Sequence, residues 1–229
     1  MKKSFKMILT PDRVTTLTQF LYYFGRNRSG VRYGTNDGEY IWNSNGRIVD
    51  PKKIQKELNE LTVNYYKNID RLSDQLENGR ITIAQWQARM RTEILDLHRT
   101  QYIIGRGGRA QMTFRDWGRL GADLRHMHYP ALDQFALDIA NGNRSAAQIH
   151  SQARLYANSS NKQFWRGRTE AKLAAGFTAE RRLLQPGESC DDCKMYDAMG
   201  WVAIGSTPDP GEETQCQSNC NCIKIYERV

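Results

Sequence analysis

The sequence predicts a mainly α-helical fold: an elongated helical bundle with an extended N-terminal arm and a small C-terminal β lobe stapled by cysteines. Three observations support this prediction. Apolar residues recur at intervals of three and four along most of the chain, helix-capping residues bracket these stretches, and all five cysteines follow residue 189. The chain accordingly divides into an arm over residues 1–49, a helical bundle over 50–177 and a cysteine-rich module over 178–229.

The composition excludes several classes of protein. The 229 residues have a mean hydropathy of −0.70 and are 39% hydrophobic, which is polar for a globular protein yet too rich in Tyr, Trp and Leu for a disordered one. No apolar run approaches the length of about 18 residues that a membrane span needs, and the basic N-terminus leads into no signal-peptide pattern. We therefore expect no membrane partner and no ordinary secreted protein.

The net charge of +8 is unevenly distributed along the chain. Residues 181–229 hold five Lys and Arg against eight Asp and Glu, so the positive excess lies in residues 1–180. A surplus of this kind forms a solvated helix surface or attracts an acidic partner such as nucleic acid. It determines solubility and steering rather than the fold.

The N-terminal arm is the least regular part of the sequence. Residues 26–49 are dominated by Gly, Asn, Ser and Arg, which predicts an extended arm or loop. Residues 1–25 contain one apolar stretch that suits either a short helix or a strand. We expect residues 40–42, Tyr-Ile-Trp, to anchor the arm on a neighbour, because a segment of this composition buries little surface of its own.

Two long helices begin the predicted bundle and form a hairpin. The first starts at Asp50, a suitable N-cap that a proline follows, and ends near Gly79. Thr82 and Gln85 have the spacing of a capping box and start the second, which the glycines of residues 105–108 end. The apolar stripe of the first helix comprises Ile54, Leu58, Leu61, Tyr65, Ile69, Leu72 and Leu76.

Two further helices complete the bundle. Thr113 starts the third, which Pro130 is expected to kink or divide. Ser145 and Gln148 repeat the capping-box spacing and start a fourth, which extends to Gly176 with or without an interruption.

No convincing catalytic set is present in the sequence, and we expect no enzymatic activity. The glycine-rich segment over residues 105–109 lacks the strand and the Lys-Ser/Thr of a phosphate-binding loop, so we interpret it as an interhelical turn. Two histidines two residues apart on a helix point in nearly opposite directions. The histidines and paired carboxylates interpreted as packed or solvated side chains are His98, His126, His128, His150, Asp191-Asp192 and Glu212-Glu213.

The cysteines carry the most specific signal in the sequence. A Cys-x-x-Cys pair is followed, after 22 residues, by a Cys-x-x-x-Cys-x-Cys group. This spacing resembles that of zinc ribbons, in which four thiolates hold one ion tetrahedrally. Five cysteines exceed four positions, and we expect Cys222 to be the spare. The candidate metal ligands are Cys190, Cys193, Cys216, Cys220 and Cys222.

Disulfides in an extracellular particle are the alternative to zinc, and unlinked thiols are a third interpretation. Either cross-link would be structural, because a module of this size cannot bury enough apolar surface to fold alone. Strands are expected to flank the cysteines at residues 181–184, 201–204 and 222–226.

The order of motifs in this module resembles a known family. The Cys-x-x-Cys pair, the Gly200-Trp201 step, the Pro/Gly loop of residues 207–211 and the terminal cysteine strand are similar to the C-terminal module of phage Mu F-like head-morphogenesis proteins. These are minor head proteins of tailed bacteriophages. The likeness is most specific over residues 188–226. Many members close with a His-Pro-x-Cys-Arg-Cys type sequence, where this chain reads Thr-Gln-Cys-Gln-Ser-Asn-Cys-Asn-Cys.

The resemblance implies a structural virion protein, a minor head or portal-associated component of capsid assembly. Its expected partners are capsid or portal subunits and further copies of itself, in a homo-oligomer or ring within the virion. Its basic part would contact packaged DNA through phosphates without sequence specificity. Two other functions stay open, a zinc-ribbon nucleic-acid-binding protein and a head–tail connector (adaptor) protein.

Overall fold

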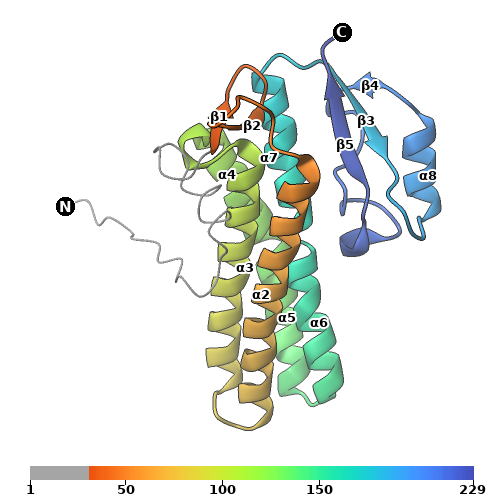
Figure 1. Ribbon diagram of the computed structural model, residues 1–229. Coiled ribbons are helices and arrows are strands. Elements are labelled where there is room, and N and C mark those ends of the chain that lie inside the picture. Colours follow the sequence, from red (N-terminus) through yellow and green to blue (C-terminus); the bar gives the residue numbers. More distant parts are fainter. Residues whose placement is uncertain (1–30) are drawn as a thin grey trace.

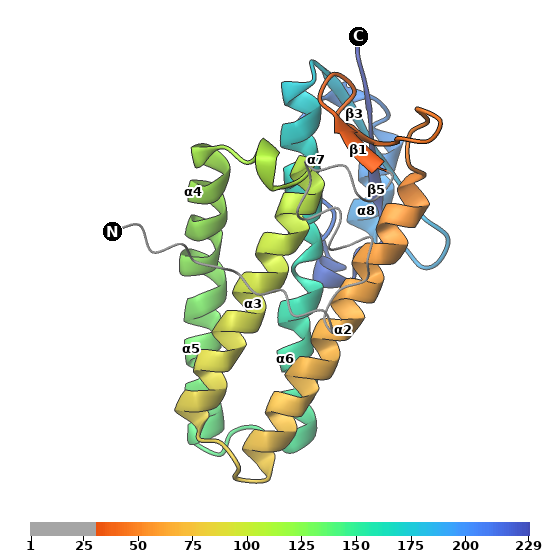
Figure 2. The ribbon, with the colours of Figure 1, turned by 60° about the vertical axis from the view of Figure 1, so that its left-hand side comes forward.

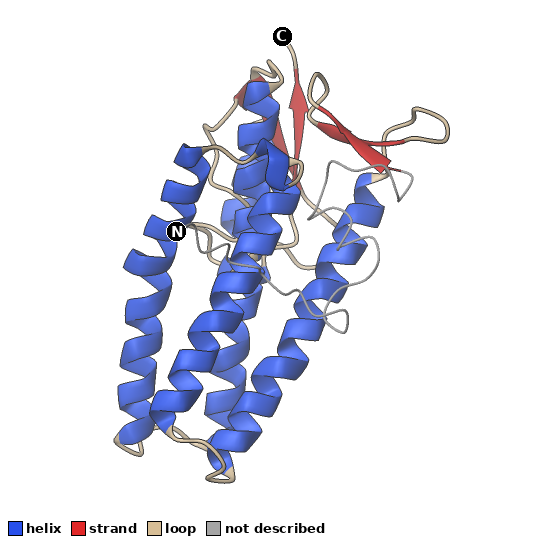
Figure 3. Ribbon diagram, turned by 90° about the vertical axis from the view of Figure 1, so that its left-hand side faces the viewer, coloured by secondary structure: helices blue, strands red, loops and turns tan. Residues whose placement is uncertain are grey.

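The computed structural model describes residues 31–229, so the helix or strand expected within residues 1–25 lies outside the described residues. The chain folds into an elongated bundle of helices with a small sheet beside one end (Figures 1 and 3). The elements are β1 (Val31–Gly34), β2 (Glu39–Trp42), α2 (Pro51–Glu77), α3 (Ile83–Arg106), η2 (Arg109–Gln111), α4 (Phe114–Asp123), η3 (Leu124–His128), α5 (Tyr129–Ala140), α6 (Ala146–Asn158), α7 (Asn161–Ala174), β3 (Ala179–Leu183), α8 (Asp191–Ala198), β4 (Val202–Ala203), η4 (Gln217–Asn219) and β5 (Ile223–Glu227).

The predicted mainly helical fold is confirmed. The stripe of α2 faces the core from Ile54 to Leu72, and Leu76 packs at its edge. Both predicted capping boxes are present, at Thr82 and Ser145, and Thr113, the predicted start of the third helix, forms another with Asp116. Local periodicity and capping chemistry therefore determine where most helices begin and which face they bury.

Glycines at one crossing allow α3 and α7 to pack backbone against backbone. A Cβ on Gly105 would overlap the carbonyl oxygen of Phe164, and a Cβ on Gly167 would overlap that of Tyr102. Both glycines lie within helices, where a glycine is unfavourable compared with alanine. The helix continues through Gly105 and ends at Arg106, with Gly107 as its C-cap at a φ of 93°, so α3 ends within the predicted glycine run.

The third predicted helix is divided near Pro130, and the division takes the form of a π-helical turn. Segment η3 lies between α4 and α5, and Pro130 occupies the first turn of α5. A proline has no N–H to donate to the carbonyl four residues earlier, and its ring crowds that carbonyl. The wider turn just before Pro130 accommodates both effects, and the chain continues as one helical rod (Figure 2).

The fourth predicted helix is interrupted between α6 and α7. The side chain of Ser160 is fully buried and bonds the carbonyl oxygen of Ala157 at 2.6 Å. It accepts a hydrogen bond from Gln101 Nε2 at 2.8 Å. The buried serine therefore turns the chain here and fixes α7 against α3.

Residues 31–42 form a two-stranded hairpin instead of the irregular loop that their composition suggested. Tyr40 is buried, as expected of the anchor, and its hydroxyl donates to the carbonyl oxygen of Ile104 at 2.6 Å. Glu39 receives ion pairs from Arg168 at 2.8 Å and Lys172 at 2.7 Å, both on α7. Tertiary contacts with α3 and α7 therefore stabilise a hairpin that local sequence does not predict.

The C-terminal lobe is a three-stranded antiparallel sheet of order β4-β3-β5 with α8 beside it. The three strands lie at or within one or two residues of the predicted stretches. Figure 1 shows the sheet next to α7, with α8 on its far side. Within the described part of the chain, no helix is both long and apolar enough to cross a bilayer.

The close crossing of α3 and α7 predicts opposite effects for two helical glycines. Gly167→Ala should lower the free energy of unfolding by about 1–3 kcal/mol, because the new methyl group overlaps Tyr102. Gly118→Ala in α4, where no atom lies within 4 Å of the new Cβ, should raise it by roughly 0.5–1 kcal/mol. Urea unfolding of both variants measures the difference; equal effects would contradict the backbone contact.

Candidate metal centre and its support

The five cysteines come from three short segments of the lobe. Cys190 is the N-cap of α8 and Cys193 lies in its first turn. Cys216 and Cys220 are the two caps of η4, and Cys222 directly precedes β5. Two tight turns and one strand start therefore bring together residues that are up to 32 positions apart in the chain.

The thiols form two groups that share Cys193. Cys190, Cys193 and Cys216 form one group and Cys193, Cys220 and Cys222 the other, each with its sulfur atoms within 4.8 Å of one another. The sulfur of Cys193 lies 3.5 Å from that of Cys216 and 3.7 Å from that of Cys220. Cys193 is thus the central member of the cluster, and its side chain is buried.

These distances suit a metal ion better than a disulfide. A disulfide needs two sulfurs about 2.05 Å apart, and all five cysteines are free thiols in the structure. Four thiolates at about 2.3 Å from one tetrahedral ion lie about 3.8 Å from one another. The cysteine cluster can therefore bind a metal ion, and the five predicted ligands are brought together as a group.

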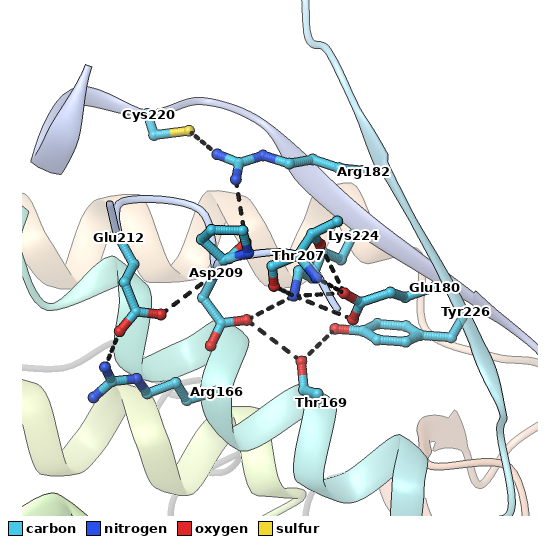
Figure 4. A network of polar contacts seen from close by, with 11 residues as sticks. Arg166, Thr169, Glu180, Arg182, Thr207, Asp209, Glu212, Cys220, Lys224 and Tyr226 are labelled. Carbon is cyan, nitrogen blue, oxygen red and sulfur yellow. Dashed lines mark hydrogen bonds and ion pairs between the residues drawn. The ribbon is translucent and has the colours of Figure 1, made fainter. Parts of the chain in front are cut away.

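A buried arginine contacts the cluster from the sheet. The Arg182 side chain, on β3, donates from Nη2 to the sulfur of Cys220 at 3.0 Å, and its Nη1 donates to the carbonyl oxygen of Pro208 at 3.1 Å (Figure 4). A hydrogen bond with Cys222 lowers the pKa of Cys220 to about 4; burial opposes this shift, and the charge of Arg182 adds to it. Cys220 is therefore held as a thiolate, the form that binds metal.

The lobe has a second buried polar centre, around Lys224 of β5. Its ammonium group lies 3.1 Å from Glu180 and 3.0 Å from Asp209, and it donates to the carbonyl oxygen of Thr207 at 2.9 Å (Figure 4). The side chains of Lys224 and Glu180 are 1% and 0% exposed. Burial without such partners would strongly disfavour these charges, so each group depends on the others.

The same centre joins the lobe to the bundle. Thr169 of α7 lies 3.0 Å from the Tyr226 hydroxyl and 3.5 Å from a carboxylate oxygen of Asp209. One turn earlier on α7, Arg166 forms an ion pair with Glu212 of the lobe. Polar contacts between side chains therefore fix the cysteine cluster against α7.

The other predicted candidates are distributed as follows. The acidic pairs are not a catalytic couple: Asp191 pairs with exposed Lys194, and Asp192 accepts from the backbone of Gln215. Glu212 pairs with Arg166, and Glu213 is exposed. His126 is exposed, and His150 lies 3.5 Å from Asp70.

Sequence reasoning missed the contacts made by the charged residues in the strands. The Arg182 and Lys224 Cα atoms are cross-strand partners in the β3–β5 register, and Glu180 lies two residues from Arg182. A charged residue at alternate positions of a predicted strand normally indicates a solvated face. Here that face is covered by α7 and by the loop over residues 207–212, which the strand pattern cannot reveal.

His98 and His128, both interpreted from the sequence as packed or solvated side chains, are in contact. Their rings are 4.3 Å apart between centroids, and Asp123 lies beside them. No pattern in the sequence indicates this pairing, because His98 lies on α3 and His128 on the π-helical turn.

Removing the buried ammonium group should unfold the lobe. Lys224→Met leaves Glu180 and Asp209 buried without a counter-charge, so the free energy of unfolding should fall by about 3–5 kcal/mol. Lys194→Met, which removes an ion pair between exposed side chains, should leave stability unchanged. Thermal unfolding followed by circular dichroism compares the two; a stable Lys224→Met variant would contradict the dependence described above.

Comparisons with protein-family models, with curated proteins and with solved structures give no match for this chain. The likeness of the cysteine module to phage head-morphogenesis proteins therefore stays a prediction from the sequence.

Proposed function

We propose that this chain is a structural virion protein of a tailed phage, a minor head or portal-associated component of capsid assembly. The observation that carries the proposal is the five-thiol cluster, because the residues that carry the family resemblance also converge in space. A cluster of thiolates fixed against a helical bundle suits a rigid assembly module. A zinc ion held by four thiolates keeps no open position at which to activate water or substrate.

We further propose that the cluster holds one zinc ion and that its role is structural. Cys190, Cys193, Cys216 and Cys220 would supply the four thiolates, and Cys222 is the spare. The distances of 3.5 and 3.7 Å join Cys216 and Cys220 to the shared sulfur of Cys193, and a lowered pKa favours the thiolate form of Cys220. The choice of Cys222 as the spare is the prediction from the sequence, since Cys222 also lies within 4.8 Å of Cys193 and Cys220. The ion would link the start of α8 to both ends of η4.

The zinc proposal predicts that two cysteine variants differ. Cys193→Ser removes the sulfur common to both groups and should abolish stoichiometric zinc binding, whereas Cys222→Ser should retain one zinc per chain. Metal analysis of protein purified in reductant, with free-thiol counting, measures both. One tightly held zinc in the Cys193→Ser variant would contradict the site.

Exposed apolar side chains supply the contact surfaces that an assembly protein needs. On the lobe these are Met195 and Met199 of α8 and the neighbouring Trp201, which are 52%, 48% and 43% exposed. On the bundle, Phe114 at the start of α4 is 98% exposed and Met127 on η3 is 61% exposed. Figure 1 places α8 and α4 on different sides of the molecule, which suits contacts with two neighbours, whether capsid or portal subunits or copies of this chain.

The nucleic-acid-binding alternative gains no support from the lobe. Residues 181–229 carry five basic against eight acidic side chains, the opposite of the charge needed for contact with phosphates. Contact with packaged DNA would therefore involve the basic bundle. A head–tail connector would use the same surfaces at another place in the particle.

The virion proposal predicts that the chain co-purifies with phage particles from a host that carries its gene. Mass spectrometry of gradient-purified particles should detect it at low copy number, and cryo-electron microscopy should place it at a head or portal position. Phe114→Ser should reduce its incorporation without changing its unfolding temperature, because the side chain is 98% exposed. Absence of the chain from intact particles would overturn the proposal.

A further inference from the structure

A second group of metal-ligating side chains lies inside the bundle, built from residues that the cysteine cluster does not use. His98 comes from α3, Asp123 is the last residue of α4, and His128 is the last residue of η3. One ligand atom from each lies within 4.8 Å of the others. His98 is 0% exposed and His128 is 7% exposed.

The π-helical turn brings Asp123 and His128 to the same side of the rod. In a regular α-helix, residues five apart differ by about 140° around the axis and diverge. In η3 the N–H of Tyr129 bonds the carbonyl oxygen of Leu124, five residues earlier, so the turn is wide enough to bring residues at this spacing into line. The distance between His128 Nε2 and an Asp123 carboxylate oxygen is then 3.4 Å.

The hydrogen bonds around His98 leave one ring nitrogen available as a ligand. Its Nε2 lies 3.1 Å from the carbonyl oxygen of Tyr156, to which it donates, so Nδ1 carries the free lone pair. Metal-binding histidines commonly donate their other N–H to a backbone carbonyl in this way. Nδ1 of His98 is buried and has no hydrogen-bond partner.

His128 Nε2 is also buried without a well-aligned hydrogen bond, although it lies 3.4 Å from a carboxylate oxygen of Asp123. The same separation equals the edge of a tetrahedron whose metal–ligand bonds are about 2.1 Å, the usual length for nitrogen and carboxylate ligands of zinc. Two buried ring nitrogens and a carboxylate oxygen therefore surround a position that a cation would fill.

Asp123 divides its two oxygens between different partners. One oxygen lies 3.1 Å from Arg166 and 3.4 Å from Lys162, whereas the other faces His128 and accepts from Gln163. Carboxylates that ligate metals are themselves held by hydrogen bonds of this kind. Asp123 also lines a surface hollow between α4, α7 and the lobe, so an ion can reach it.

We propose that His98, Asp123 and His128 bind a divalent transition-metal ion of the zinc, cobalt and nickel class, separately from the thiol cluster. Imidazole and carboxylate ligands suit these ions, and the thiols of the lobe supply none of the ligands. The ion joins the middle of α3 to the π-helical turn and thereby fixes the point at which the rod of α4 and α5 is divided.

The test uses the full-length chain, reduced and loaded with one equivalent of zinc per thiol cluster. Titration with Co²⁺ should then show one further equivalent bound, with the visible absorption of a nitrogen- and oxygen-ligated ion. It should lack the near-ultraviolet sulfur-to-cobalt band that marks thiolate ligation. His128→Gln should weaken this binding at least about tenfold.

His126→Gln is the matched control, since His126 lies in the same turn with its side chain exposed, and it should bind Co²⁺ like the parent. Asp123→Asn keeps the shape of the side chain and removes its charge, so it should also lose the site. It is the second test variant in case His128→Gln does not fold. No cobalt beyond the thiol cluster, or equal weakening by His126→Gln, would overturn the proposal and indicate a buried water between these side chains.

Discussion

The close contact between α3 and α7 is the constraint on which the rest of the structure depends. Gly105 and Gly167 remove the side chains that would separate the two backbones. At this distance, the side chains of α7 reach three parts of the molecule. Arg168 and Lys172 hold the hairpin through Glu39, Thr169 contacts the lobe, and Lys162, with Arg166, contacts Asp123. A shift of α7 would therefore disturb the hairpin, the lobe and the histidine pair together.

The lobe illustrates how a small sheet is stabilised when its apolar surface is limited. Its three strands cannot form a large core, and their inner face instead carries the charges of Glu180, Arg182 and Lys224. Each charge is compensated by a named partner: a carboxylate, a carbonyl oxygen or a thiolate. Arg182 contacts both the thiol cluster and the loop around Pro208, so the cysteine cluster and the buried ion network support each other.

The thiol cluster is held in place by several independent contacts, in keeping with the structural role proposed above. The thiol cluster is held by turns, by a buried arginine and by the docking of the sheet on α7, which are features of a rigid module. The exposed apolar side chains lie on α8, which also carries two of the cysteines, and on α4 and η3 of the bundle. A rigid interior and exposed contact residues are the properties that the proposed role in a larger assembly requires.

The sequence alone determined the helices, because their signals are local. The apolar period of α2, the capping boxes at Thr82 and Ser145 and the helix start at Thr113 depend on a few neighbouring residues, and they were predicted at the observed positions. The spacing of the cysteines likewise predicted that they would converge, since two short turns are sufficient to bring their sulfurs together.

Only the tertiary structure decided the features that depend on distant partners. The hairpin at residues 31–42 exists because Tyr40 and Glu39 meet α3 and α7, and the charged strand face is buried because α7 covers it. The sequence alone does not explain Gly105 inside α3. The structure shows that a side chain there would overlap the carbonyl oxygen of Phe164. The pairing of His98 with His128 depends on a π-helical turn and on helix packing across 30 residues, and neither leaves a periodic signal in the sequence.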